Sequence, residues 1–181
     1  MPVTTLLIPV GTWTADPVHS SAAFEVEHLG VSNFRATFSD LEATLVAGEE
    51  VVGLEGGALI ESISVREPEL RGHLLSPDFF DAERHADICF ASTDVRPNGE
   101  GEIAVDGDLT IKGTTRRIRA AGRIGTPGLD PSGRERIAIE LEATVDRRSF
   151  GLGWNMELPG GKLAVGNDVR LLVSLELVKA G

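Results

Sequence analysis

The sequence predicts a mainly β protein, an eight-stranded antiparallel barrel with one or two short helices. Apolar and polar residues alternate along eight segments of about ten residues, which is the period of a strand with one buried face. Glycine is frequent, with 21 residues between and within these segments, as tight turns between strands require. Closing the sheet on itself removes its unpaired edges and leaves an interior for side chains or one slender ligand.

The clearest element is a hairpin over residues 105–120. The apolar face of its first strand carries Val105, Gly107, Leu109 and Ile111. The alternation breaks at Lys112-Gly113-Thr114, where Gly113 can take the positive φ that a short hairpin loop needs. The apolar side then resumes at Ile118 and Ala120. Such a hairpin is unstable alone and needs other strands over its apolar side.

The other elements follow from the same alternation. Residues 1–11 are expected to form a loose extension, and Pro17 interrupts any ladder that residues 12–17 begin. Strands are expected at 19–29, 34–45 with a bend, 57–65, 88–95, 135–145 and 168–179, and the hairpin's second strand continues to residue 124. Residues 57–65 are apolar on both faces, so the periodicity does not choose their buried side.

Residues 67–75 break the β rhythm and predict a short helix. Pro68 suits a first helical turn, Glu69 suits the positive end of the helix dipole, and Leu70, Leu74 and Leu75 form a narrow apolar stripe. The Ser76-Pro77-Asp78 segment ends it, and Phe79 and Phe80 follow on a loop or second short turn.

Composition excludes several classes of function. At 181 residues the chain is expected to be one domain, and its net charge of −11 argues against nucleic-acid binding. The single cysteine, Cys89, cannot form an internal disulfide and is expected to be small and buried. No Lys or Arg precedes the first apolar patch, and no segment approaches about 18 apolar residues, so no secretory signal or membrane span is expected. We therefore expect a cytoplasmic protein.

The histidines do not indicate a metal site. His19 and His28 lack the spacing of a local metal pair, and no metal or cofactor is expected. Asp16 and His19 are interpreted as a hydrogen-bonded structural pair in preference to a proton relay. His28 shares the apolar side of its strand with Phe24 and Val26, so its ring would give a mostly apolar cavity one polar contact.

Other polar groups offer little catalytic chemistry. Acidic residues gather at Asp78, Asp81, Glu83 and Asp87, but loop acids are usually solvated or capping. No serine lies in a Gly-x-Ser-x-Gly nucleophile elbow, and no phosphate loop or dinucleotide fingerprint is present. Several arginines could bind a phosphate head group by bidentate hydrogen bonds, but the favoured interpretation is that they form a charged outer strand face. These arginines are Arg116, Arg117, Arg119, Arg147 and Arg148.

Several segments together resemble the YceI-like family of polyisoprenoid-binding, lipocalin-like proteins. They occur in family order between Trp13 and Gly151, as Trp13–Ser20, Phe24–Ser32, Leu74–Ala82, Phe90–Thr93, Gly107–Arg116 and Asp146–Gly151. The resemblance implies a lipocalin-like barrel that holds a long isoprenoid or other lipid chain in an internal tunnel, and it implies a possible homodimer. Ala36 stands where the family usually has Gly, and Ala86 stands at a position that is usually Pro-like.

The predicted function is non-enzymatic binding, storage or transport of a polyisoprenoid or similar long-chain lipid in an apolar tunnel. The alternatives are a barrel hydrolase or isomerase that uses His28 or the Asp78 and Asp81 acids, and a stress-related protein with a filled core. The residues expected to contact the ligand are mostly apolar and face inward or lie on loops: Phe24, Val26, His28, Phe34, Phe38, Leu59, Phe79, Phe80, Phe90, Leu109, Leu141 and Trp154.

Overall fold

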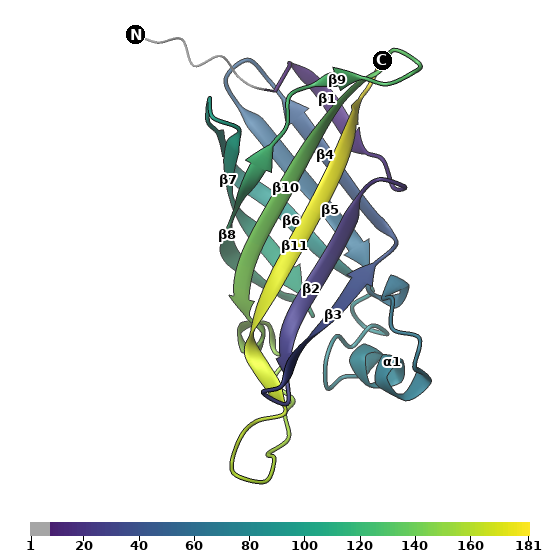
Figure 1. Ribbon diagram of the computed structural model, residues 1–181, viewed down its shortest axis with the longest axis vertical. Helices are drawn as coiled ribbons and strands as arrows, with labels where there is room; N and C mark the ends of the chain where they lie inside the picture. Colours follow the sequence, from purple (N-terminus) through teal and green to yellow (C-terminus); the bar gives the residue numbers. More distant parts are fainter. Residues whose placement is uncertain (1–7) are drawn as a thin grey trace.

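The computed structural model describes residues 8–181 and shows an elongated barrel with a helix at one end (Figure 1). Its strands are β1 Gly11–Ala15, β2 Ser21–His28, β3 Ser32–Phe38, β4 Leu41–Ala47, β5 Val52–Leu59, β6 Asp87–Pro97, β7 Glu102–Ile111, β8 Thr114–Ile124, β9 Gly128–Leu129, β10 Glu135–Asp146 and β11 Val165–Lys179. Its helices are α1 Pro68–Leu75 and the 3-10 turns η1 Ile60–Ser62 and η2 Arg147–Phe150. None of these described helices is long and apolar enough to cross a bilayer.

β1 and β2 together take the place of one long interrupted strand, and β3 and β4 take the place of another. Counted in this way, the sheet is a closed barrel of eight antiparallel strands. The last residues of β11 pair with β1 and its earlier residues pair with β2, while β4 pairs with β1 and β3 pairs with β2. The barrel closes between β10 and β11, which stay in register from Arg136↔Val178 to Asp146↔Asp168. The predicted fold class is therefore confirmed.

The predicted hairpin forms as β7 and β8, paired from Glu102↔Arg123 to Ile111↔Thr114. Lys112 and Gly113 take φ of +50° and +74°, the pair of positive values that matches a two-residue hairpin turn to the twist of its strands. Every second residue of β7 is buried, as the alternation predicts. Gly107 is required on that face because a Cβ there would lie 2.4 Å from Cζ of Phe90.

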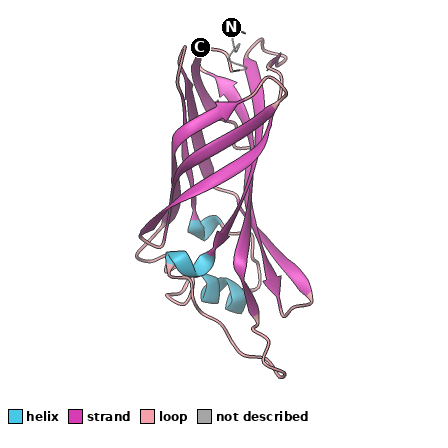
Figure 2. Ribbon diagram, turned by 90° about the vertical axis from the view of Figure 1, so that its left-hand side faces the viewer, coloured by secondary structure: helices cyan, strands magenta, loops and turns pink. Residues whose placement is uncertain are grey.

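The barrel has two ends of different character. Figure 2 shows the helical segments near one end, which we call the helical end, and the C-terminus at the other. Large side chains fill the interior towards the C-terminal end: Ile8, Trp13, Leu45, Ile137, Ile139 and Leu177 are each at most 1% exposed. The prediction of a loose extension is wrong for residues 8–11, because Ile8 is buried and Gly11 begins β1, and residues 1–7 lie outside the described residues.

The helix forms where the sequence predicts it. Pro68 occupies the first turn of α1, and the Glu67 carboxylate accepts hydrogen bonds from the backbone N–H groups of Glu69 and Leu70, at 3.1 and 2.7 Å. Of its apolar stripe, Leu74 is buried and Leu70 is exposed. Residues 60–86, which include α1, pack beside the outer edge of β3, where the isolated bridge Phe38↔Ile63 replaces a strand partner.

Candidate ligand-binding site

A cavity of about 230 Å³ lies inside the barrel and extends to its helical end. Its wall is almost entirely apolar, and the side chains come from strands on every side of the barrel. They include Ala22, Phe24, Val26, Leu54, Ala58, Leu109, Ile111, Ile118, Ala120, Leu141, Ala143, Val145, Val169, Leu171 and Val173. An apolar cavity has no groups that hold water, so such a space stays dry and takes up apolar molecules.

Short inward-facing side chains on several strands make room for the cavity. On β10 the inward positions run from Ile137 and Ile139, in the filled part, to Ala143 and Val145 at the cavity wall. Ala120 of β8 and Ala58 of β5 add short side chains to the same wall. The interior is therefore filled in one half of the barrel and hollow in the other. The predicted tunnel is therefore closed by packed side chains towards the C-terminal end of the barrel. The alternative of a filled core describes that half of the interior only.

Aromatic rings cover one side of the cavity. Phe24 lies at the centre of the group, with ring centroids 5.9 Å from Phe38, 6.1 Å from Phe34 and 6.2 Å from Phe80. Phe38 and Phe80 meet edge to face at 6.0 Å. These rings come from β2, β3 and the segment after α1, so they join that segment to the barrel wall. Tilted and edge-on contacts of this kind stabilise aromatic clusters beyond their buried area.

A second aromatic group borders the helical end of the cavity, which we call the mouth. The His73 ring stands edge-on to Trp154 at 4.6 Å and to Phe79 at 4.9 Å, and its Nε2 lies 3.0 Å from the Asp78 carboxylate. Lys112, in the β7–β8 turn, donates hydrogen bonds to the carbonyls of Pro77 and Gly151. This lysine thereby ties the segment after α1 and the end of η2 to the hairpin turn.

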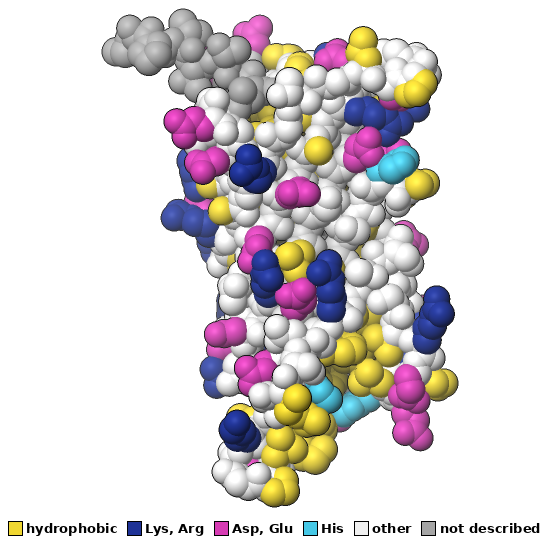
Figure 3. All heavy atoms as spheres, viewed as in Figure 1, with side chains coloured by type: hydrophobic (Ala, Val, Ile, Leu, Met, Phe, Trp, Pro, Cys, Tyr) yellow, Lys and Arg dark blue, Asp and Glu magenta, His cyan; other side chains and the backbone are white. Residues whose placement is uncertain are grey.

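Exposed apolar side chains lie at the helical end of the barrel. They come from the turn between β2 and β3 and from the loop before β11: Leu29, Val31, Met156 and Leu163. Figure 3 shows apolar side chains gathered on the lower part of the visible face, while charged side chains are scattered over the remainder. The helical end is therefore the most apolar part of the face shown in Figure 3.

The structure places eight of the twelve predicted contact residues at the cavity wall: Phe24, Val26, Phe38, Phe79, Phe80, Phe90, Leu109 and Leu141. Their contact with a ligand stays a prediction. Phe34 and Trp154 are half-buried and border the cavity through Phe24 and Phe79.

Two of the predicted contact residues, Leu59 and His28, do not line the cavity, and the expected burial of the cysteine is wrong. Leu59 is 44% exposed, because β5 ends there and the adjacent buried position is taken by Ile60 at the start of η1. His28 has the same strand parity as Phe24 and Val26, but it lies where β2 extends past the cavity, and it is exposed. Cys89 is exposed because its neighbours Ile88 and Phe90 take the inward positions of β6.

The polar groups considered for catalysis lie away from the cavity. Asp78 pairs with His73 at the mouth, and none of the four loop acids Asp78, Asp81, Glu83 and Asp87 lines the cavity wall. Of the arginines, Arg117 and Arg119 pair with Asp108 and Asp106 on the outer face of the hairpin, as the favoured interpretation predicts.

Arg147 is the exception among the arginines, because it points inward. It is 5% exposed, lines the cavity, and donates hydrogen bonds to the backbone carbonyls of Leu152, Trp154, Val165 and Gly166. Burial lowers the pKa of its guanidinium. The prediction of an outer-face position is wrong here, because the chain leaves β10 at Asp146 and turns into η2, where strand alternation no longer applies. Arg148 lies outside and pairs with Asp146.

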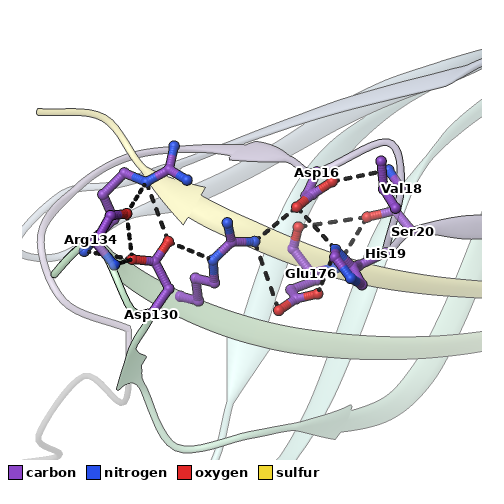
Figure 4. A network of polar contacts seen from close by, with 9 residues as sticks. Asp16, Val18, His19, Ser20, Asp130, Arg134 and Glu176 are labelled. Carbon is purple, nitrogen blue, oxygen red and sulfur yellow. Dashed lines mark hydrogen bonds and ion pairs between the residues drawn. The ribbon is translucent and has the colours of Figure 1, made fainter.

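A polar network fastens the barrel near the break between β1 and β2 (Figure 4). The predicted pair of Asp16 and His19 is confirmed, with His19 Nδ1 3.0 Å from the carboxylate. Arg136 Nη1 lies 2.8 Å from Asp16 and 3.7 Å from Glu176, while its Nε lies 2.9 Å from Asp130.

These contacts make the network structural. The hydrogen bonds of Arg136, and then of His19, hold the pKa of Asp16 well below its usual range. Asp16, His19 and Glu176 lie close enough to hold a cation, but the Arg136 guanidinium already supplies positive charge to both carboxylates. The network joins the β1–β2 connection, β10 and β11.

A closed antiparallel barrel with an apolar cavity in its interior is the architecture of lipocalin-like β proteins. The model of the YceI-like domain family matches residues 13–177, and the chain belongs to that family. A "UPF0312 protein" of Pseudomonas fluorescens strain Pf-5 is 32% identical over 170 residues, which cover 90% of this chain and 83% of that protein. A "UPF0312 protein" of Staphylococcus epidermidis is 28% identical and covers 89% and 94%.

Solved structures share the fold at low sequence identity. The crystal structure of Burkholderia cenocepacia BcnA superposes with a TM-score of 0.75 at 16% identity, covering 92% of this chain and 99% of that one. A domain from Saccharophagus degradans, described as a polyisoprenoid binding domain implicated in plant cell wall breakdown, superposes with a TM-score of 0.68 at 9% identity and covers 95% and 100%. These likenesses support the barrel architecture.

Proposed function

We propose that this protein binds a polyisoprenoid or similar long-chain lipid, with the chain inside the cavity and the remainder at the mouth. The observation that carries the proposal is the cavity itself, whose wall is almost entirely apolar. Membership of the YceI-like family, and the fold shared with a domain described as polyisoprenoid binding, support a binding role. The catalytic alternative has less support, because His28, Asp78 and Asp81 do not line the cavity.

The size of the cavity sets the length of chain it can hold. At about 30 Å³ for each packed water-sized group, a volume of 230 Å³ accommodates about eight to nine such groups. A methylene group is close to a water molecule in size, so about eight to nine carbons of a chain fit, and a longer polyisoprenoid extends through the mouth.

The energetics favour binding without a strong polar anchor. Burying about eight to nine methylene groups contributes about 6 to 7 kcal/mol, and association and ordering cost at least about 4 kcal/mol. Carbons of a longer chain that pack on apolar side chains at the mouth add up to about 0.8 kcal/mol each. Affinity therefore comes from the buried length of the chain.

A ladder of neutral prenyl alcohols tests the proposal. Prenol, geraniol and farnesol differ by one isoprene unit each and are titrated against the purified protein by competition with a pyrene-labelled alkane. Geraniol should bind at least tenfold more tightly than prenol, because it buries about five more carbons. Farnesol, whose chain is longer than the cavity, should gain less over geraniol. Weak binding that does not depend on chain length would contradict the proposal.

A further inference from the structure

Arg147 is a buried positive charge whose hydrogen bonds within the described chain all go to neutral groups. Its guanidinium forms no ion pair with any acidic group in residues 8–181, and the carboxylate of the adjacent Asp146 bonds Arg148 instead. The groups that Arg147 does contact are backbone carbonyls, which are neutral. Proteins normally pair a buried charge, because removing it from water is costly.

The hydrogen bonds of Arg147 leave part of the guanidinium free. A guanidinium has five N–H groups. Nε donates to Gly166, Nη1 donates to Leu152 and Trp154, and Nη2 donates to Val165. The second N–H of Nη2 has no partner within the described chain. Arg147 also forms part of the cavity wall beside Leu152 and Val165, at the mouth.

We propose that Arg147 receives the carboxylate of a long-chain acid whose hydrocarbon tail fills the cavity. This inference rests on the proposed function and narrows the ligand to an acidic lipid with its head at the mouth. One buried positive charge is matched by one negative charge, which a carboxylate carries, whereas a phosphate monoester carries nearly two at neutral pH. A neutral alcohol of the same length leaves the guanidinium uncompensated.

Hexadecanoic acid and hexadecan-1-ol test this on the native protein at pH 8, by competition with a pyrene-labelled alkane. Their tails are equal, so a difference in affinity reports the head group. The acid should bind at least tenfold more tightly than the alcohol. If both bind equally, the inference is overturned and the proposed function stands. If neither binds, both fail.

Variants at two adjacent arginines locate the effect. Arg147→Met should abolish the preference for the acid while binding of the alcohol persists. Arg148→Met is the matched control, since Arg148 is exposed and pairs with Asp146, and it should keep the preference. A preference that survives in folded Arg147→Met, or that disappears in Arg148→Met, overturns the inference.

A spectroscopic measurement on the native protein tests the inference even if the Arg147→Met variant does not fold. Hexadecanoic acid labelled with ¹³C at its carboxyl carbon is bound to the protein, and its chemical shift is followed with pH. Contact with the guanidinium should lower the pKa of the bound carboxyl below that of monomeric free acid, because an adjacent cation favours the charged form. A raised pKa places the carboxyl in an apolar site away from Arg147 and overturns the inference.

Discussion

Filling the cavity from within should remove binding without unfolding the protein. Ala120, on β8, is 7% exposed and lines the cavity, whereas its neighbour Ala121 points outward and is exposed. The substitutions Ala120→Phe and Ala121→Phe therefore add the same ring to the same strand on opposite faces of the barrel wall. Only the first ring enters the cavity.

The expected effect follows from the number of carbons displaced. Phenylalanine carries six more carbons than alanine, and a ligand chain excluded from six methylene positions loses about 5 kcal/mol. That loss corresponds to about 3,000-fold in Kd. For the protein itself, burial of the ring contributes about 1.5 to 3 kcal/mol and local crowding costs about 1 to 3 kcal/mol. The free energy of unfolding should therefore change by no more than about 2 kcal/mol.

The assay pairs ligand titration with urea unfolding. Geranylgeraniol is titrated against native protein and both variants, and the unfolding midpoints show that each variant is folded. Ala121→Phe should bind like the native protein, and Ala120→Phe should show no measurable binding at micromolar ligand. Equal binding by the two variants would refute the placement of the chain in this cavity.

Three further perturbations test the fold around the site. Trp13→Ala should lower the free energy of unfolding in urea by about 3 to 5 kcal/mol, because this side chain is fully buried in the filled half. Gly113→Ala should cost about 1 to 3 kcal/mol in the same assay, because φ is +74° and a Cβ would lie 2.8 Å from His85 Cε1. The pKa of Asp16 is lowered by Arg136, so its stabilising contribution is complete above about pH 4 and is lost as pH falls below that value. In thermal melts across that range, Arg136→Gln should therefore lose less stability on acidification than the native protein; an equal or steeper loss contradicts the assignment.

Local patterns were sufficient for the elements that local physics decides. The turn at Lys112 and Gly113, the inward residues of β10 and the helix that begins at Pro68 all form where the sequence predicts them. Each depends on neighbouring residues in the chain: a two-residue period, a glycine at positive φ, or a proline in a first helical turn.

Properties set by distant strands were not predictable in the same way. His28 lies on the same face of β2 as Phe24 and Val26, as the alternation predicts. The alternation does not say where the cavity ends along β2, and His28 lies beyond that point. The inward turn of Arg147 depends on η2, where strand alternation stops. The division into a filled and a hollow half depends on side-chain volumes summed across the barrel, although the change from Ile139 to Ala143 along β10 is a signal that a sequence carries.

The most direct test of the account is a crystal structure with a chain acid brominated at its terminal carbon. Anomalous scattering from bromine locates the end of the tail independently of side-chain density. We predict a bromine peak inside the barrel beside Ala120 and Leu141, where the cavity meets the filled half, with the carboxylate at the mouth. A bromine peak outside the barrel, with the cavity empty, would contradict the central claim that the hollow half holds the hydrocarbon chain.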